Sequence, residues 1–399
     1  MTALEDVDQS IARLRILMVT PGYLPEIGGV EIHVGNIATR LAARGVEVTV
    51  LCGTHDPALV GRSEIDGVEI IRVRARASFA RWAPGIRAEM AAGQWDVVHI
   101  QSFHTLVAPM AMRAARRVGL PYVVTFHGGG SSSAWLNRIR SSQIRVLGPL
   151  LRRAHRLIAV ADFEVAHYGE LLGLDADRFR VVPNGADLPS TRPSGTDDPG
   201  VIDASRTGPI VSIGRLERYK GHHRVIAAMP SILQSQPDAR LVVLGAGPYC
   251  DDLARQVAEL GLEHAVTIRS IPAERRDEMA QLLGSASLVT LLSDFETHPI
   301  GALEAISLGR QLLVTDGSGL AELVERSQAV GITDIDDPTT VASAVVDLLR
   351  HPRPPRSTAI PTWDECADGL LDVYRTTLTG DPRDEDLDAQ SVLSALDRR

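Results

Sequence analysis

The 399-residue sequence has few cysteines and no long apolar segment. Cys52, Cys250 and Cys366 have neither the spacing of a metal site nor that of a CxxC pair, so we interpret them as reduced thiols. No apolar run approaches the ~18–20 residues that a membrane-spanning helix needs. The polar start, MTALEDVDQSIARLR, is unlike a signal peptide. These features predict a cytoplasmic protein, and the length allows two α/β domains.

Lysine is almost absent. Of the 41 basic residues, 40 are arginine and the single lysine is Lys220. A codon bias in a GC-rich genome explains a general depletion of lysine. It does not explain why the one remaining lysine lies in the segment GRLERYKG, where a compact ammonium that the planar arginine fork cannot replace is one explanation.

Acidic residues are missing from 101–160, and 71–160 holds 14 arginines against Glu89 and Asp96. Solvated surfaces normally mix charges of both signs, so this stretch is expected to contact something anionic. Within residues 134–157, Leu and Ile alternate with arginines. A basic amphipathic segment of this kind can lie on an anionic membrane surface, or it can be a helix with a hydrated face. The acceptor- or membrane-facing candidates are Arg138, Arg140, Arg145, Arg152 and Arg153, with Arg156 in the same segment.

Apolar runs alternate with amphipathic segments in two series. The first series predicts strands at 14–20, 46–52, 96–101, 122–128, 156–161 and 179–185, with helices after the Gly-Gly pair and near 105–118. The second predicts strands at 209–215, 239–247, 265–270, 286–293 and 311–316, with helices near 221–235, 250–260, 273–284 and 301–308. Such βαβ repeats predict parallel, doubly wound sheets. We expect an N-terminal domain over 1–188, a Pro/Gly/Ser/Asp-rich linker over 189–208, a C-terminal domain over 209–362, a helix over 363–378 and a polar tail over 379–399.

Two glutamates stand out in SDFETHPIGALEAISLG. Glu296 follows an apolar strand and Glu304 lies within the next predicted helix. A carboxylate accepts hydrogen bonds from sugar or ribose hydroxyls, so this pair can hold two sugars of one ligand. Two solvated helix glutamates are the alternative.

Cations, glycines and a histidine follow other strands. Arg215 and Lys220 in GRLERYKG suit a diphosphate, or a surface turn. Gly28-Gly29 opens the first helix, where a phosphate can approach the backbone, although such a pair is often only a loop. His127 in TFHGGG ends a strand and can bind a sugar hydroxyl, or it has a structural role.

Together these features resemble the retaining GT-B glycosyltransferases of family 4. The resemblance also includes PNGAD (183–187), LVVLGAGP (241–248), GSGLAELV (317–324) and the closing helix with Trp363. It implies an α/β fold with two Rossmann-like domains facing each other across a cleft, and a last helix that crosses back to the N-terminal domain. It further implies transfer with retention, without a bound metal or other cofactor.

The resemblance also assigns roles. Glu296 would contact the donor hexose, Glu304 the ribose, and Arg215 with Lys220 the diphosphate; His127 would lie beside the transferred sugar. The implied catalytic residues are Glu296, His127, Arg215 and Lys220, and the implied donor-binding residues are Gly28, Gly29, Arg215, Lys220, Glu296, His298, Ile300 and Glu304. His298, Pro299, Arg310-Gln311 and Asp162 depart from the family pattern, which bears on donor-sugar identity.

The expected reaction transfers a hexose-type sugar from a UDP or GDP donor to an acceptor hydroxyl. The expected acceptor is anionic or lipid-linked, with peripheral contact at the inner face of the membrane and no nucleic-acid partner. A pyridoxal-phosphate phosphorylase would need Lys220 as its Schiff-base lysine, because there is no other lysine. A non-catalytic nucleotide-sugar-binding module and a nucleotide-sugar epimerase remain alternatives.

Overall fold

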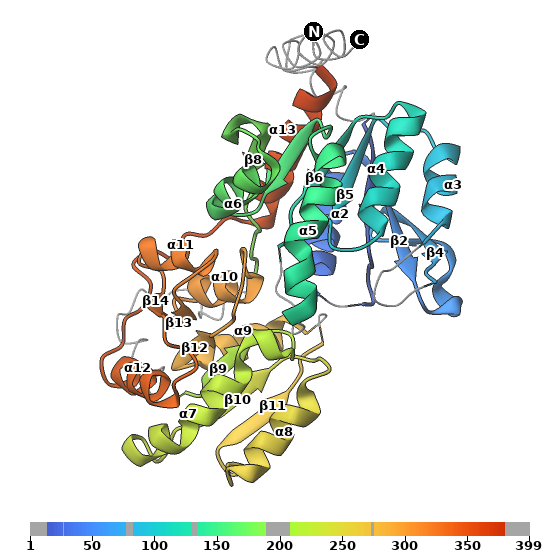
Figure 1. Cartoon of the computed structure of the whole chain (residues 1–399). Helices are drawn as coiled ribbons and strands as arrows, with labels where there is room; N and C mark the ends of the chain where they lie inside the picture. The colour runs from blue at the N-terminus through green and yellow to red at the C-terminus, as the bar shows by residue number, and fades with distance from the viewer. Residues whose placement is uncertain are drawn as a thin grey trace.

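The computed structural model describes residues 14–26, 28–76, 83–128, 134–188, 208–272 and 275–379, apart from the side chains of 134–142. It has two lobes, each built on a largely parallel sheet (Figure 1). The strand order is β3-β4-β2-β1-β5-β6-β7-β8 in the N-terminal lobe and β11-β10-β9-β12-β13-β14 in the C-terminal lobe. The predicted fold class, two Rossmann-like α/β halves, is confirmed.

The N-terminal sheet contains the six strands expected from the apolar runs and one further hairpin. Its strands are β1 (Arg15–Thr20), β2 (Glu47–Thr54), β3 (Gly61–Ile65), β4 (Val68–Arg74), β5 (Val97–Gln101), β6 (Tyr122–Thr125), β7 (Arg156–Ala159) and β8 (Phe179–Val181). Only β3 pairs in the antiparallel sense, with β4. The strand β3 was not expected, because its residues, GRSEI, are mostly polar and exposed at the sheet edge.

Helices cover both faces of this sheet. One face packs on α3 (Gly85–Ala92), α4 (Val107–Val118), α5 (Ala134–Leu151) and α6 (Asp162–Leu172), and the other packs on α2 (Gly29–Ala43) and α13 (Trp363–Thr379). Each face therefore has its own buried apolar cluster, as a two-faced parallel sheet requires.

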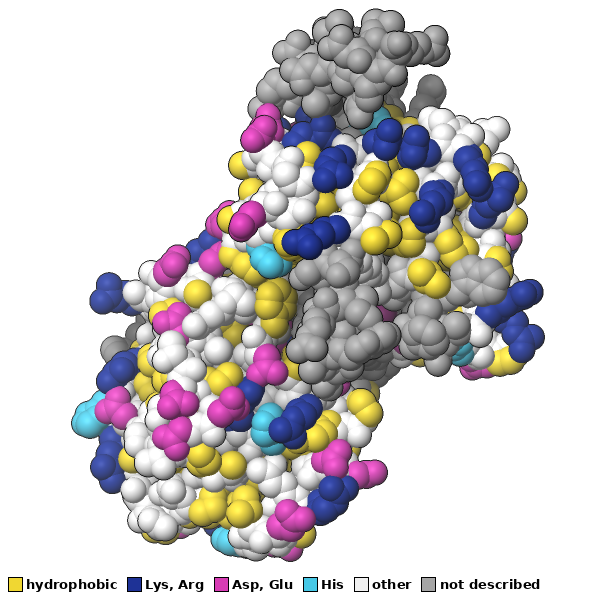
Figure 2. Space-filling view, viewed as in Figure 1, with side chains coloured by type: hydrophobic (Ala, Val, Ile, Leu, Met, Phe, Trp, Pro, Cys, Tyr) yellow, Lys and Arg dark blue, Asp and Glu magenta, His cyan; other side chains and the backbone are white. Residues whose placement is uncertain are grey.

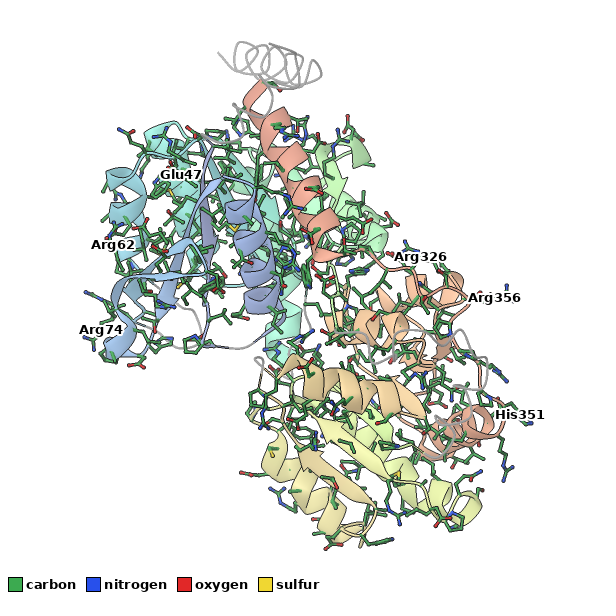
Figure 3. The ribbon with its side chains drawn as sticks, turned by 180° about the vertical axis from the view of Figure 1, so that it is seen from behind. Glu47, Arg62, Arg74, Arg326, His351 and Arg356 are labelled. Atoms are coloured by element: carbon green, nitrogen blue, oxygen red, sulfur yellow. The ribbon has the colours of Figure 1, made fainter. Side chains whose placement is uncertain are left out.

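The last helix returns to the N-terminal lobe, as expected. Seen from behind, orange-red α13 runs beside blue α2 (Figure 3). Trp363 and Tyr374 are buried among the apolar side chains of β1, β2 and α2. Arg44 on α2 adds ion pairs with Asp364 at 2.9 Å and Asp368 at 2.8 Å.

The C-terminal sheet is parallel throughout. Its strands are β9 (Ile210–Ile213), β10 (Leu241–Leu244), β11 (Val266–Arg269), β12 (Leu288–Leu291), β13 (Leu312–Thr315) and β14 (Val330–Ile332). The helices are α7 (His222–Ser235), α8 (Cys250–Glu259), α9 (Arg276–Ser285), α10 (Ile300–Ser307), α11 (Leu320–Glu325) and α12 (Pro338–Arg350). Two apolar clusters again lie on opposite faces of the sheet. The elements β14, α11 and α12 were not among those expected; β14 is only three residues long and half-buried.

Each sheet has one point at which the order of its strands reverses along the chain. In the N-terminal sheet it lies between β1 and β5, and in the C-terminal sheet between β9 and β12. Ligands of open parallel sheets bind beyond the carboxyl ends of the strands at such points. A ligand site is therefore expected at the carboxyl ends of β1 and β5 in one lobe and of β9 and β12 in the other.

Side chains also join the lobes directly. Asn184, after β8, donates from Nδ2 to the carbonyl of His298 at 2.8 Å, and Thr297 Oγ1 donates to the carbonyl of Gly128 at 3.3 Å. Arg326, labelled near the junction of the lobes in Figure 3, pairs with Asp162 at 3.1 Å. The predicted linker over 189–208 lies outside the described residues except for its last one.

Candidate functional site

The single lysine lies against the first glutamate of the predicted pair. Lys220 closes a short 3-10 helix (Arg218–Lys220) after β9, and Glu296 follows β12, so both stand at the strand-order reversal. Lys220 Nζ lies 2.6 Å from Glu296 Oε1, which also accepts from Ser293 Oγ at 2.8 Å. Gly221 follows Lys220 with φ of +77°, and a Cβ there would clash with the carbonyl oxygen of Leu292. Glycine therefore allows the lysine loop to lie directly against the end of β12.

This ion pair is buried, with side-chain exposures of 14% for Lys220 and 8% for Glu296. Burial alone would lower the pKa of Lys220, but the Glu296 carboxylate outweighs it, and the pKa is raised. The ammonium is therefore charged at neutral pH. Ser318 Oγ accepts from the backbone N–H of Glu296 at 3.0 Å, which fixes the loop that carries the carboxylate.

Arg215 stands nearby and is more exposed. Its NH1 lies 3.0 Å from Glu217 Oε1, and its NH2 donates to Tyr219 Oη at 3.0 Å. Burial acts to lower the pKa of Arg215, but Tyr219, Glu217 and Glu31 raise it. Glu31 lies on the first turn of α2, in the other lobe.

The second glutamate has a partner that the sequence did not reveal. Glu304 on α10 is buried and forms an ion pair with Arg276 NH2 at the start of α9. Burial raises the pKa of Glu304, and Arg276 only partly offsets the shift. Nothing in AERRDE distinguishes Arg276 from the other charged residues of this segment, because the pairing depends on how α9 packs beside α10.

The glycine pair begins α2, as predicted. Gly28 is the extended residue before the helix and Gly29 is its first residue. A Cβ on Gly28 would meet the Glu31 carboxylate, whereas a Cβ on Gly29 would meet no described atom within 4 Å. The packing of the described chain therefore does not require glycine at 29, and the open space there leaves room for a ligand beside the helix N-terminus.

His127 follows β6 and is half-buried. Its Nε2 lies 2.7 Å from Gln101 Oε1, and its ring is edge-on to that of His33 with centroids 4.6 Å apart. Burial, reinforced by His33, His99 and His104, holds the pKa of His127 well below its usual value. The ring is therefore neutral at physiological pH and presents one lone pair.

His127 and Glu296 stand on loops that touch. Gly128 and Thr297, their respective neighbours in sequence, are in contact through the Thr297 hydroxyl. The fold thus gathers His127, Glu296 and Lys220 around one junction, and Arg215 lies on the same loop as Lys220.

Two predicted donor residues lie in the contact between the lobes. His298 Nδ1 accepts from the backbone N–H of Asn184 at 3.1 Å, and burial lowers the pKa of His298 to about 4. Ile300 packs against the apolar cluster formed by α2 and α13. Gln101 was not singled out by the sequence, and Asn184 appeared only as part of PNGAD with no role assigned, because their partners lie far away along the chain.

The predicted basic segment divides. Arg145 on α5 and Arg152 and Arg153 just after it are exposed, while the side chains of Arg138 and Arg140 lie outside the described residues. Including Arg156 in the exposed segment was wrong: it begins β7 and is only 4% exposed. Because β7 lies between β6 and β8, its first residue is covered on both sides.

Among the described residues there is no group of three or more His, Cys, Asp or Glu side chains placed to hold a metal ion. No helix in the described part of the chain is long and apolar enough to span a membrane.

Both lobes of the chain match known glycosyltransferase families. Residues 27–189 match the family Glycosyltransferase Family 4, and residues 205–360 match Glycosyl transferases group 1. The chain is 30% identical over 370 residues to a glycogen synthase of Mycobacterium tuberculosis strain H37Rv, covering 85% of this chain and 87% of that protein. It is 28% identical over 403 residues to a D-inositol 3-phosphate glycosyltransferase of Frankia alni, covering 89% and 96%.

Solved structures show the same fold. Sucrose-phosphate synthase from Thermosynechococcus elongatus superposes with a TM-score of 0.73 at 19% identity, over 92% of this chain and 100% of that one. With both halves matched by glycosyltransferase families and a 30% identical relative along most of its length, the chain belongs to the GT-B glycosyltransferases of the family 4 type.

Proposed function

We propose that this glycosyltransferase moves a hexose from a nucleoside diphosphate sugar to an acceptor hydroxyl, with retention and without a metal ion. The observation that carries the proposal is the buried Lys220–Glu296 pair at the strand-order reversal of the C-terminal sheet. A donor that enters there offers a phosphate to the ammonium and sugar hydroxyls to the carboxylate. Each side chain of the pair then exchanges its partner for a group of the donor.

The bond between the sugar C1 and the diphosphate oxygen breaks in this reaction, and negative charge develops on the leaving diphosphate. Lys220 and the more exposed Arg215 are the cations placed to stabilise that charge, which is the contribution a metal ion makes in other transferases. The leaving phosphate oxygen takes the proton of the acceptor hydroxyl on the same face of the sugar. The acceptor oxygen bonds to C1 from that face, so the anomeric configuration is retained.

The remaining donor contacts that we propose involve Gly29, Glu304 and Arg276. Gly29 leaves open space at the N-terminus of α2, where backbone N–H groups favour an anion. Glu304 lies on α10, which follows the loop that carries Glu296. When the donor binds, its ribose hydroxyls would donate to the Glu304 carboxylate beside Arg276. Glu304 and Arg276 therefore act in donor binding, whereas Glu296 acts at the transferred hexose.

The direct test is transfer in the presence of EDTA with a panel of UDP and GDP hexoses. The expected product carries the donor's anomeric configuration, read from the proton coupling at C1, and its rate is unchanged by the chelator. An inverted product, or activity that needs added magnesium or manganese, would overturn the mechanism. Epimerised donor formed without acceptor indicates an epimerase, and neither transfer nor donor hydrolysis indicates a binding module.

For the acceptor, we propose an anionic molecule bound by the N-terminal lobe. In Figure 2 Lys and Arg side chains are frequent over this lobe, whereas acidic side chains are most frequent over the other lobe, where some Lys and Arg side chains also lie. The exposed arginines of α4 and α5 carry no carboxylate partner among the described residues and are interleaved with exposed Leu106, Val118 and Val146. These arginines are Arg113, Arg116, Arg117, Arg145, Arg152 and Arg153.

Two anionic acceptors fit this surface: a phosphorylated polyol, as the name of the Frankia relative implies for that protein, and a lipid-linked acceptor at an anionic membrane. Near such a membrane each arginine contributes about 1 kcal/mol of binding. Co-sedimentation with phosphatidylglycerol vesicles at low and high salt separates the two. Binding at low salt that is lost at high salt supports the lipid-linked acceptor. Activity on a soluble phosphorylated acceptor without vesicle binding supports the polyol, and activity on a neutral or cationic acceptor alone overturns both.

A further inference from the structure

A buried polar side chain, Gln101, lies between His127 and the last helix, α13. Gln101 is the last residue of β5, at the strand-order reversal of the N-terminal sheet, and is 1% exposed. Its Oε1 lies 2.7 Å from His127 Nε2, and its Nε2 lies 3.3 and 3.4 Å from the two ring nitrogens of His99. The amide oxygen thus contacts His127, and the amide nitrogen lies over the face of the His99 ring. The strand β5 is paired with β1 and β6 on either side.

His99 is held in turn from two elements. Its Nδ1 lies 2.6 Å from the hydroxyl of Tyr374 on α13, and its Nε2 lies 2.6 Å from Thr125 Oγ1 on β6. Burial lowers the pKa of His99 to about 3, so the ring is neutral. A continuous polar chain thus runs from α13 through His99 and Gln101 to His127.

The direction of the last contact determines which nitrogen of His127 carries the proton. An amide oxygen only accepts hydrogen bonds, so His127 Nε2 must donate to Gln101 Oε1. In a neutral imidazole the other nitrogen, Nδ1, then has the lone pair. Nδ1 has no hydrogen-bond partner among the described atoms. On the other side, the edge-on ring of His33 limits rotation of His127.

We propose that Gln101 is a positioning residue that fixes His127 as the Nε2–H tautomer, so that Nδ1 accepts a hydrogen bond from a hydroxyl of the transferred sugar. This rests on the proposed function, because it assigns His127 to the donor sugar. It adds that a group that donates a hydrogen bond, such as a sugar hydroxyl, is favoured next to His127 Nδ1. It also adds that α13, from the far end of the chain, helps to hold Gln101 in place, because Tyr374 fixes the His99 ring against which the Gln101 amide packs.

The tautomer can be measured without any activity. In protein labelled with ¹⁵N-histidine, multiple-bond proton–nitrogen correlation assigns the protonated nitrogen of His127, identified by the signals that disappear in His127→Asn. The wild type is expected to show a protonated Nε2 and an unprotonated Nδ1. In Gln101→Met, which removes the acceptor at similar volume, the signals are expected to move toward a mixture of tautomers.

Activity provides the second readout. Gln101→Met is expected to lower kcat about tenfold, the effect of one net hydrogen bond, with less than a twofold change in the donor KM. Gln101→Glu places a carboxylate on Nε2–H and favours the imidazolium. In this variant the pKa of His127 is expected to rise. The pH below which kcat falls is therefore expected to be higher than in the wild type. The groups facing His127 that also bear on this limb are His33, His99 and His104.

The matched control is Gln311→Met. Gln311 is also buried, and its amide binds the carbonyls of Ser287 and Leu348 and the N–H of Arg353, none of which belongs to the proposed donor site. This control is expected to lose stability while the tautomer of His127 and the pH profile stay unchanged.

Four results are decisive. A protonated Nδ1 in the wild type, or an unchanged tautomer in Gln101→Met, would overturn the assignment of Gln101. A changed tautomer with unchanged kcat would support the positioning role and overturn the contact between His127 and the sugar. A changed tautomer with reduced kcat supports both.

Discussion

Lys220 Nζ and Glu296 Oε1 lie 2.6 Å apart, although the two residues are 76 positions apart in the sequence. The loops that carry them follow β9 and β12, the adjacent strands between which the strand order reverses. A buried ion pair is weak evidence for stability, because desolvation offsets much of the attraction. We therefore interpret the pair as two halves of a donor site.

Lys220→Ala and Arg215→Ala are each expected to remove most transfer activity. Losing one charge-assisted contact to the departing diphosphate should cost about 2–4 kcal/mol of transition-state stabilisation. The measurement is kcat/KM, with the unfolding midpoint as a check on folding. Because Lys220→Ala leaves Glu296 buried without its counterion, Ser293→Ala is a useful comparison: it removes a neutral partner of the same carboxylate. Near-normal turnover in both arginine and lysine variants would contradict the diphosphate assignment.

Substitutions of Glu296 and Glu304 are expected to change different kinetic constants. Glu304→Ala should raise the donor KM more than it lowers kcat, because the ribose is remote from the bond that breaks, and Glu296→Ala should mainly lower kcat. Arg276→Ala, which removes the partner of Glu304, is expected to resemble Glu304→Ala. Steady-state kinetics with varied donor measure all three. The opposite pattern would show that the roles of the glutamates are exchanged.

Gly29→Ala tests the space at the start of α2. Because a Cβ there meets no described atom, the variant is expected to fold with unchanged or slightly higher stability, and to bind the donor at least tenfold more weakly. Gly35→Ala on the same helix is the control, since its Cβ would make only ordinary contacts with Leu24 and Tyr23. Calorimetric titration with the donor compares them. Equal affinity in both variants would remove Gly29 from the site.

Glu164 gives a pH-dependent prediction. It is fully buried at the start of α6, and burial raises its pKa to about 8. Between about pH 4.5 and 8, Glu164 is protonated in the folded protein and ionised in the unfolded chain. The free energy of unfolding therefore falls as the pH rises through this window, and it levels off above about pH 8. The slope reaches at most about 1.4 kcal/mol per pH unit.

Glu164→Gln should lack this component. The difference in unfolding free energy between variant and wild type, measured by urea denaturation from pH 5 to 9, is expected to move in favour of the variant up to about pH 8. A difference that is independent of pH would show that Glu164 is ionised in the folded protein.

The sequence was informative where local chemistry decides the structure. The buried parallel strands are continuous apolar runs, and Gly28-Gly29 does begin α2. The pairing of Glu304 with Arg276, and of His127 with Gln101, depends on packing between distant elements, for which a single sequence carries no signal. Arg156 was misplaced for a related reason: a strand at 156–161 was expected, but charge periodicity alone cannot show that the side chain of its first residue is buried.

The most direct test of the donor site is a thermal-shift titration with UDP and GDP sugars in EDTA. At about 100 times its dissociation constant, a ligand adds roughly 2.7 kcal/mol to the free energy of unfolding. We predict that at least one nucleoside diphosphate sugar raises the unfolding midpoint of the wild type accordingly, and that Arg215→Ala and Lys220→Ala lose most of this shift. Equal shifts in the wild type and both variants would contradict the central claim that these two cations hold the diphosphate.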